Sequence, residues 1–260
     1  MECVTKMNEQ ITRIVIPYKD IYTTVFVVQT EEGVLLFDAA GSDWDIETYV
    51  LPYLNEIGIE ADGVKFVFIS HNHSDHAGGI SAYLKAFPNI CIITRNPGLK
   101  EAYQNKAVFM PEGSEVVLGD LKIISIPGHT KDSAGIYDMR TKTLITGDCL
   151  QLYGIFGSGK WAANISVPKE HFDAIDELKA MDIEELLMAH DYQPLGYRCV
   201  GKQAVSDALE ACIKPLDEVK ELILSHPECN DEEIAAIYNS PNRPTLGAHV
   251  VTALRSLMVG

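Results

Sequence analysis

The apolar residues of the N-terminal part of the chain fall into short blocks separated by turn residues. Three blocks rich in Val, Ile and Phe predict an opening set of strands, at Ile11 to Pro17, Thr23 to Gln29 and Val34 to Phe37. Wider apolar spacing then predicts helices alternating with buried strands. These elements are a helix over Asp45 to Ile57, a strand over Val64 to Ser70, a helix over Gly79 to Phe87 and a strand over Ile90 to Thr94.

The alternation of predicted strands and helices repeats further along the chain, which ends in a predicted helical segment. Strands are predicted over Glu115 to Leu118, Leu121 to Pro127, Ala134 to Tyr137, Thr143 to Thr146 and Glu185 to Ala189, with a helix over Lys169 to Met181. From Lys202 onward, apolar residues three and four apart predict helices, with Pro215 as a kink or a new start. We therefore expect an α/β catalytic domain over 1–198 and a helical C-terminal extension, packed on it, over 199–260.

Composition and charge narrow the classes of protein. The 260 residues are 47% apolar and carry a formal net charge of −16, which disfavours nucleic acid as a substrate because no run of Lys and Arg compensates for it. No stretch is long and apolar enough to predict a bilayer-spanning helix. Met1 to Gln10 does not resemble a secretory signal, and the six cysteines are scattered without a CxxC pair. We expect a cytoplasmic protein with reduced thiols and no membrane partner.

The decisive string is His71-Asn72-His73-Ser74-Asp75-His76, which follows the predicted strand Val64 to Ser70. Side chains two apart in an extended segment point the same way, so His71 and His73 can reach one metal ion. Asp75 and His76 turn toward a second position as the next helix begins. A loop that is merely rich in histidine is the alternative, but such dense imidazoles and a carboxylate are costly to bury unless a cation holds them.

Three further polar residues are expected just past predicted strand ends, and strand ends gather at one rim of a sheet. They are His129, Asp148 and His190. Each alone is more typical of a turn or of the core. Together with the histidine string they favour metal ligands.

These motifs resemble those of the metallo-β-lactamase superfamily, whose ordered set is a strand-end Asp, HxHxDH, His, Asp and His. The resemblance covers roughly residues 10 to 195, with Asp38 as the first motif. It implies an αβ/βα four-layer sandwich, the metallo-β-lactamase fold. It also implies the ligands: His71, His73 and His129 for the first metal, Asp75, His76 and His190 for the second, Asp148 bridging both, and Asp38 supporting them from outside.

The resemblance implies a metallo-hydrolase with two Zn²⁺ per chain, although iron or manganese would also suit these ligands. Hydroxide held between the ions would attack a small-molecule ester, thioester or lactone, in a core similar to glyoxalase II and to lactonases. Asp75 is the candidate for orienting the nucleophile and moving its proton. The motifs leave open an iron-dependent oxidoreductase similar to persulfide dioxygenases, a phosphodiesterase or RNA-processing relative, and a catalytically dead scaffold.

Four aromatic residues are weaker candidates for substrate contacts: Tyr153, Phe156, Trp161 and Tyr192. The first three fall in a glycine-rich segment, predicted to be a mobile loop, that fits the first seven positions of the phosphate-binding pattern GxxxxGK. Trp161 stands where that pattern needs Ser or Thr, which argues against a nucleotide site. The C-terminal helices could cap the active site, form a homodimer interface, or do both.

Overall fold

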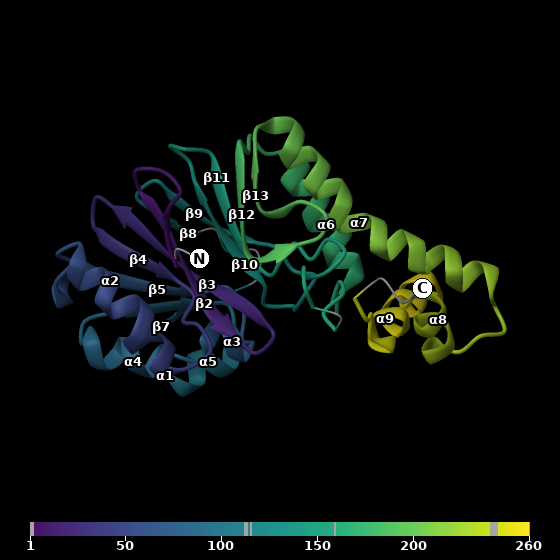
Figure 1. Cartoon of the computed structure of the whole chain (residues 1–260), viewed down its shortest axis with the longest axis horizontal. Coiled ribbons are helices and arrows are strands. Elements are labelled where there is room, and N and C mark those ends of the chain that lie inside the picture. The colour runs from purple at the N-terminus through teal and green to yellow at the C-terminus, as the bar shows by residue number, and fades with distance from the viewer. Residues whose placement is uncertain (1–2, 112–113, 115, 159, 240–243, 260) are drawn as a thin grey trace. The chain divides into compact units, whose positions relative to one another are not determined.

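The computed structural model describes residues 3–111, 114, 116–158, 160–239 and 244–259 of the chain. These residues form two compact units, Met1–Ile123 and Ile124–Gly260 (Figure 1). The domain boundary that the sequence predicts, after residue 198, divides the chain at a different position from these two units, and it stays a prediction. None of the described helices is both long and apolar enough to cross a membrane.

The first unit is built on a seven-stranded sheet with the strands in chain order, β1 to β7. Strands β1 to β4 pair antiparallel, whereas β4 to β7 pair parallel. Its strands are β1 (Val4–Lys6), β2 (Ile11–Tyr18), β3 (Ile21–Thr30), β4 (Gly33–Phe37), β5 (Val64–Ile69), β6 (Cys91–Thr94) and β7 (Ala107–Phe109). Its helices are α1 (Asp43–Asp45), a π-helical turn (Ile46–Val50), α2 (Leu51–Glu56), a 3₁₀ turn (Ala61–Gly63), α3 (Ser74–Ala77), α4 (Ile80–Ala86) and α5 (Pro97–Ala102).

The core of the first unit forms because β-branched and aromatic strand residues face apolar helix residues. Ile46, Val50 and Leu54 share one buried cluster with strand residues such as Val67 and Ile92. The parallel strands β4 and β5 end side by side, since Phe37 pairs with Phe68. The loops that follow these two strands therefore begin at the same edge of the sheet.

The second sheet has the strand order β13-β12-β11-β10-β9-β8, and β9 spans the boundary between the units. Strands β11 and β12 pair parallel, whereas β10 with β11, β12 with β13 and β8 with β9 pair antiparallel. The strands are β8 (Val116–Leu118), β9 (Leu121–Ser125), β10 (Ala134–Asp138), β11 (Thr143–Gly147), β12 (Glu185–Tyr192) and β13 (Gly196–Val200). The helices of the second unit are α6 (Pro168–Lys179), α7 (Lys202–Ser225), α8 (Asp231–Tyr238) and α9 (Ala248–Val259).

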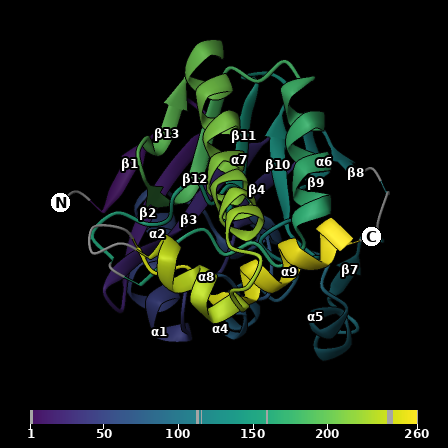
Figure 2. The ribbon, with the colours of Figure 1, turned by 90° about the vertical axis from the view of Figure 1, so that its right-hand side faces the viewer.

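Helices α6 and α7 lie side by side, and α7 also contacts β12 and β13 (Figure 2). Helices α8 and α9 contact each other and α7, through a buried cluster that includes Leu216, Ile234 and Val250. Asn230 and Glu233 form a capping box at the start of α8. The predicted helical C-terminal part is thus confirmed, and α7 continues through the buried Pro215.

Most predicted elements are present, with two kinds of correction. The predicted strand Glu185 to Ala189 was too short, because β12 continues to Tyr192; His190 therefore lies within the strand, not past its end. Elements β1, β7, β13 and α5 were not predicted. They are six residues long or shorter, so their apolar periodicity is weak. Glu115, the predicted start of β8, lies outside the described residues.

Candidate metal centre

Asp38 lies at the end of β4 and organises the polar residues that follow β5. Its Oδ1 accepts a hydrogen bond from the Ser70 backbone N–H at 2.7 Å, and its Oδ2 accepts one from the Ser70 hydroxyl at 2.9 Å. The same Oδ2 lies 2.7 Å from Nδ1 of His76. Asp38 is fully buried, and burial raises its pKa, while His76 and the Ser70 hydrogen bonds oppose that rise.

The backbone around Asp38 is held in an unusual conformation. Asp38 and Ala40 have φ angles of 67° and 48°, in the left-handed region that non-glycine residues rarely adopt. Backbone hydrogen bonds from Ala39 N–H to the His76 carbonyl and from Gly78 N–H to the Ala40 carbonyl hold this loop against α3. Strained backbone that is fixed by its surroundings is concentrated at functional sites.

Four potential ligands of the first unit follow β5 within six residues, as two pairs. Nε2 of His71 lies 3.0 Å from Nδ1 of His73, and His73 is the N-cap residue of α3. Nε2 of His76 lies 3.5 Å from Oδ2 of Asp75. The pairing of His71 with His73, and of Asp75 with His76, is the arrangement that the sequence predicts.

Asp148 is the centre of the second unit's set of polar residues. It follows β11 directly, and its Oδ1 lies 3.2 Å from Nε2 of His190, which β12 supplies from the neighbouring parallel strand. Its Oδ2 lies 3.8 Å from Nε2 of His129, in the loop after β9. All three are at least nine-tenths buried. One carboxylate thus presents its two oxygens to two different imidazoles.

Hydrogen bonds fix which ring nitrogen two of the buried histidines, His129 and His76, can offer to a metal. Nδ1 of His129 donates to the Asn164 carbonyl at 2.7 Å, and Nδ1 of His76 contacts the Asp38 carboxylate. In both residues Nε2 therefore points to the neighbouring carboxylate of its own unit. Metal-binding histidines are oriented in this way, and a set of imidazoles and carboxylates suits zinc, iron and manganese.

Comparison with known families decides the identity of the chain. The model of the "Metallo-beta-lactamase superfamily" matches residues 18–190, a span that includes Asp38 and all seven candidate ligands. The chain belongs to the metallo-β-lactamase superfamily. Its α/β sandwich fold class with a helical C-terminal part is the one that the sequence predicts.

Curated relatives of this superfamily member carry the name hydroxyacylglutathione hydrolase. A hydroxyacylglutathione hydrolase of Pectobacterium atrosepticum is 28% identical over 145 residues, covering 54% of this chain and 53% of that protein. The chain thus spans about half the length of this relative.

Solved structures support the fold. A metallo-β-lactamase from Hirschia baltica has a TM-score of 0.61 at 16% identity, covering 80% of this chain and 96% of that one. The rubredoxin oxygen:oxidoreductase from Desulfovibrio gigas has a TM-score of 0.66 at 16% identity, covering 97% of this chain and 82% of that one. At these identities the likeness concerns the fold alone.

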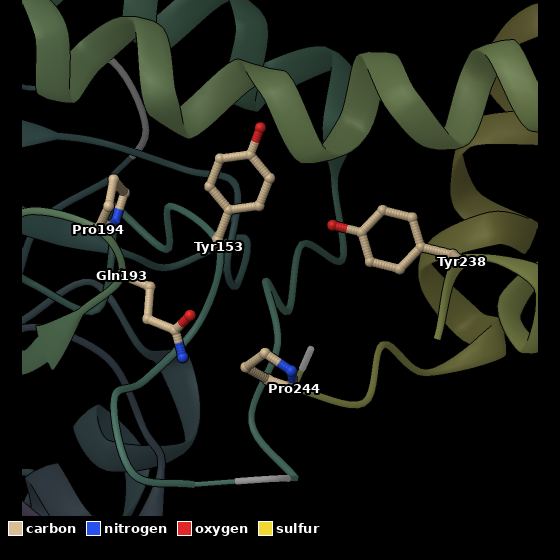
Figure 3. A pocket seen from close by; sticks show the side chains of 5 residues that line it. All are labelled: Tyr153, Gln193, Pro194, Tyr238 and Pro244. Atoms are coloured by element: carbon tan, nitrogen blue, oxygen red, sulfur yellow. The ribbon is translucent and has the colours of Figure 1, made fainter. Parts of the chain in front are cut away.

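The aromatic candidates of this superfamily member lie in differing surroundings. Tyr153 lines a pocket of about 240 Å³ with four other residues (Figure 3), and its hydroxyl donates to Glu218 at 2.9 Å. Phe156 and Trp161 are 46% and 39% exposed, whereas Tyr192 is fully buried with its ring 5.8 Å from that of His190. The other lining residues of the pocket are Gln193, Pro194, Tyr238 and Pro244. Roles for the four candidates in substrate binding stay predictions.

The glycine-rich segment is anchored to the end of β12. The Tyr153 N–H donates to the Gln193 carbonyl, the Gln193 N–H to the Gly154 carbonyl, and the Phe156 N–H to the Asp191 carbonyl. These hydrogen bonds tie residues 153–156 to the end of β12, and the mobility of the segment stays a prediction. Gly159, part of the GxxxxGK pattern, lies outside the described residues, and no described helix begins between Lys160 and Pro168.

Two residues that sequence reasoning missed connect the ligands of the second unit. Gln151 is buried and donates from Nε2 to the Asp148 carbonyl at 2.8 Å. Asn164 supplies the carbonyl that accepts from His129. Neither belongs to a motif, and the only signal in the sequence is that Gln151 follows Asp148 by three residues.

Because of the buried His171 on α6, we expect the folding stability of the protein to depend on pH. His171 is fully buried, and burial lowers its pKa to about 4, with a hydrogen bond to the Cys212 carbonyl opposing the shift and His129 adding to it. The unfolded chain therefore takes up a proton before the folded one as the pH falls. Stability from this group is complete above about pH 6.5 and is lost toward pH 4, by about 3 kcal/mol.

Urea unfolding of the metal-free protein at pH 7 and pH 4.5 tests this expectation. His171→Gln should lose less stability than wild type between the two pH values, because glutamine does not titrate. An equal loss in both proteins would contradict a neutral, buried His171.

Proposed function

We propose that this protein is a metal-dependent hydrolase that cleaves a small-molecule ester, thioester or lactone with two zinc ions. One observation supports this proposal above the others. The two oxygens of Asp148 face His190 and His129, and a carboxylate that bridges two ligand groups must have one oxygen facing each group. The two ligand sets would act on one dinuclear centre, as membership of the superfamily implies.

Seven side chains would hold the ions. His71, His73 and His129 would bind the first, Asp75, His76 and His190 the second, and Asp148 would bridge them. When bound, two such ions lower the pKa of a shared water and polarise a carbonyl group. Asp38 holds the His76 ring through Nδ1 and so directs Nε2 toward the ion.

Asp75 would orient the nucleophile and transfer its proton to the leaving group. Its side chain is 14% exposed, unlike the buried Asp38, and can therefore exchange a proton with solvent or substrate. The Thr23 hydroxyl donates to the Asp75 carbonyl at 2.8 Å and holds the backbone from which this carboxylate projects.

The relatives named hydroxyacylglutathione hydrolase support a thioester as the first substrate to test. The charge of −16 supports a small molecule over nucleic acid. All six cysteines are free thiols, which supports a cytoplasmic location. A homodimer formed through the C-terminal helices is part of the same proposal.

The experiment is hydrolysis by the zinc-loaded full chain of a thioester, a carboxylic ester, a lactone, a β-lactam and a phosphodiester. We expect turnover of one or more of the first three, and loss of it after treatment with a chelator. Hydrolysis of the phosphodiester alone, or of none of the five, would contradict the proposal.

A further inference from the structure

Gln151 is a buried amide, 5% exposed, in the loop that follows β11. Its Nε2 donates to the Asp148 carbonyl at 2.8 Å and to the Tyr192 hydroxyl at 3.3 Å. Its Oε1 accepts from the Asn164 backbone N–H at 3.1 Å. Because the partner of Oε1 is a donor and a partner of Nε2 is a carbonyl, the orientation of the amide is fixed.

Each of these three bonds leads to a different metal ligand of the second unit. The first holds the backbone of Asp148 itself. The second holds Tyr192, whose ring contacts that of His190 edge to face, with 5.8 Å between centroids and 83° between planes. The third holds Asn164, whose carbonyl accepts from Nδ1 of His129 at 2.7 Å.

The side chain of Asn164 extends this network to the C-terminal helix α9. Its Oδ1 lies 2.6 Å from Nε2 of His249, at the start of that helix. His249 is exposed, so its replacement costs little packing. The chain of contacts thus runs from α9 through Asn164 to the imidazole of His129.

We propose that Gln151 is a positioning residue that aligns Asp148, His129 and His190 for metal binding, and that His249 couples helix α9 to this alignment through Asn164. The inference rests on the proposed function, because it concerns the same metal centre. It gives the C-terminal helices a role in holding the site, beyond a cap or an interface. Side chains behind a ligand act by limiting its orientations, so their loss weakens metal binding.

Gln151→Met tests the central residue, because methionine has a similar length and volume but forms none of the three hydrogen bonds. Competition of metal-free full chain with a chromophoric chelator for Zn²⁺ should show binding about 10- to 100-fold weaker than in wild type. The matched control is Thr143→Val, which removes a buried hydrogen bond to Glu185 at the opposite end of the same strand, β11. This control should lose stability without loss of zinc affinity.

His249→Ala tests the link to α9. We expect zinc binding about three- to tenfold weaker, with the melting temperature of the metal-free protein unchanged. His249→Gln, which can place an amide donor toward Asn164, should restore most of the affinity. His226→Ala, on the turn after α7, is the control and should bind zinc as wild type does.

The outcomes separate the inference from the proposed function. Wild-type zinc affinity in both Gln151→Met and His249→Ala would overturn the positioning role and leave the hydrolase intact. An equal loss in Thr143→Val would overturn it too, because a general loss of stability would then explain the effect. A wild-type protein that binds no zinc would overturn both.

Discussion

Replacing Asp148 by alanine is expected to remove both metal ions and to lower hydrolysis by at least about a thousandfold, while leaving the fold intact. The physical reason is that its two oxygens face Nε2 of His190 at 3.2 Å and Nε2 of His129 at 3.8 Å. Within the second unit, Asp148 is thus the carboxylate that faces both candidate imidazole ligands. Loss of a shared ligand removes charge compensation and a bond from each ion at once.

Elemental mass spectrometry and circular dichroism of the purified variant provide the measurement. Asp173→Ala is the matched control, because Asp173 is an exposed carboxylate on α6, paired only at the surface with Lys169. It should retain both metals and wild-type activity. If Asp148→Ala retained two metal ions, the bridging role would be contradicted. The circular dichroism spectrum would detect a variant that had unfolded.

Replacing Asp38 by alanine is expected to lower the free energy of unfolding by about 3 to 5 kcal/mol and to weaken metal binding as well. Asp38 is fully buried and accepts from the Ser70 backbone N–H, the Ser70 hydroxyl and the His76 ring. Alanine leaves these buried donors without their acceptor. It also releases the His76 ring, whose other nitrogen belongs to the proposed metal site.

Urea unfolding of the metal-free protein isolates the loss of stability from the loss of metal. Asp62→Ala is the control, since that exposed carboxylate accepts a surface hydrogen bond from Asn89. It should change stability by less than about 0.5 kcal/mol. A stability loss in Asp38→Ala as small as that of the control would show that Asp38 does not organise the loops after β4 and β5.

The fold class could be predicted, and the candidate ligands could be proposed, because both depend on local patterns. The string His71 to His76 sits directly after an apolar strand, and a strand of period two followed by a helical turn determines how its side chains pair. The helical tail was predictable from its apolar stripe. Asp38 was predictable only through the family motif, because its partners Ser70 and His76 lie more than 30 residues away.

The parts that were missed depend on long-range contacts or on short segments. His190 was expected past a strand, but the pairing of Tyr192 with Gly196 of β13 continues β12 beyond it. Gln151 contacts residues 13 and 41 positions away, which no periodicity reveals. The hydrogen bond between His249 and Asn164 spans 85 positions and joins a helix to a loop.

The central claim is that the two ligand sets together hold a pair of zinc ions. Elemental mass spectrometry of the freshly purified full chain tests it most directly. We predict about two zinc ions per chain. Predominantly iron would contradict the zinc hydrolase and favour oxidoreductase chemistry, and a protein that neither contains nor takes up metal would contradict the metal centre itself.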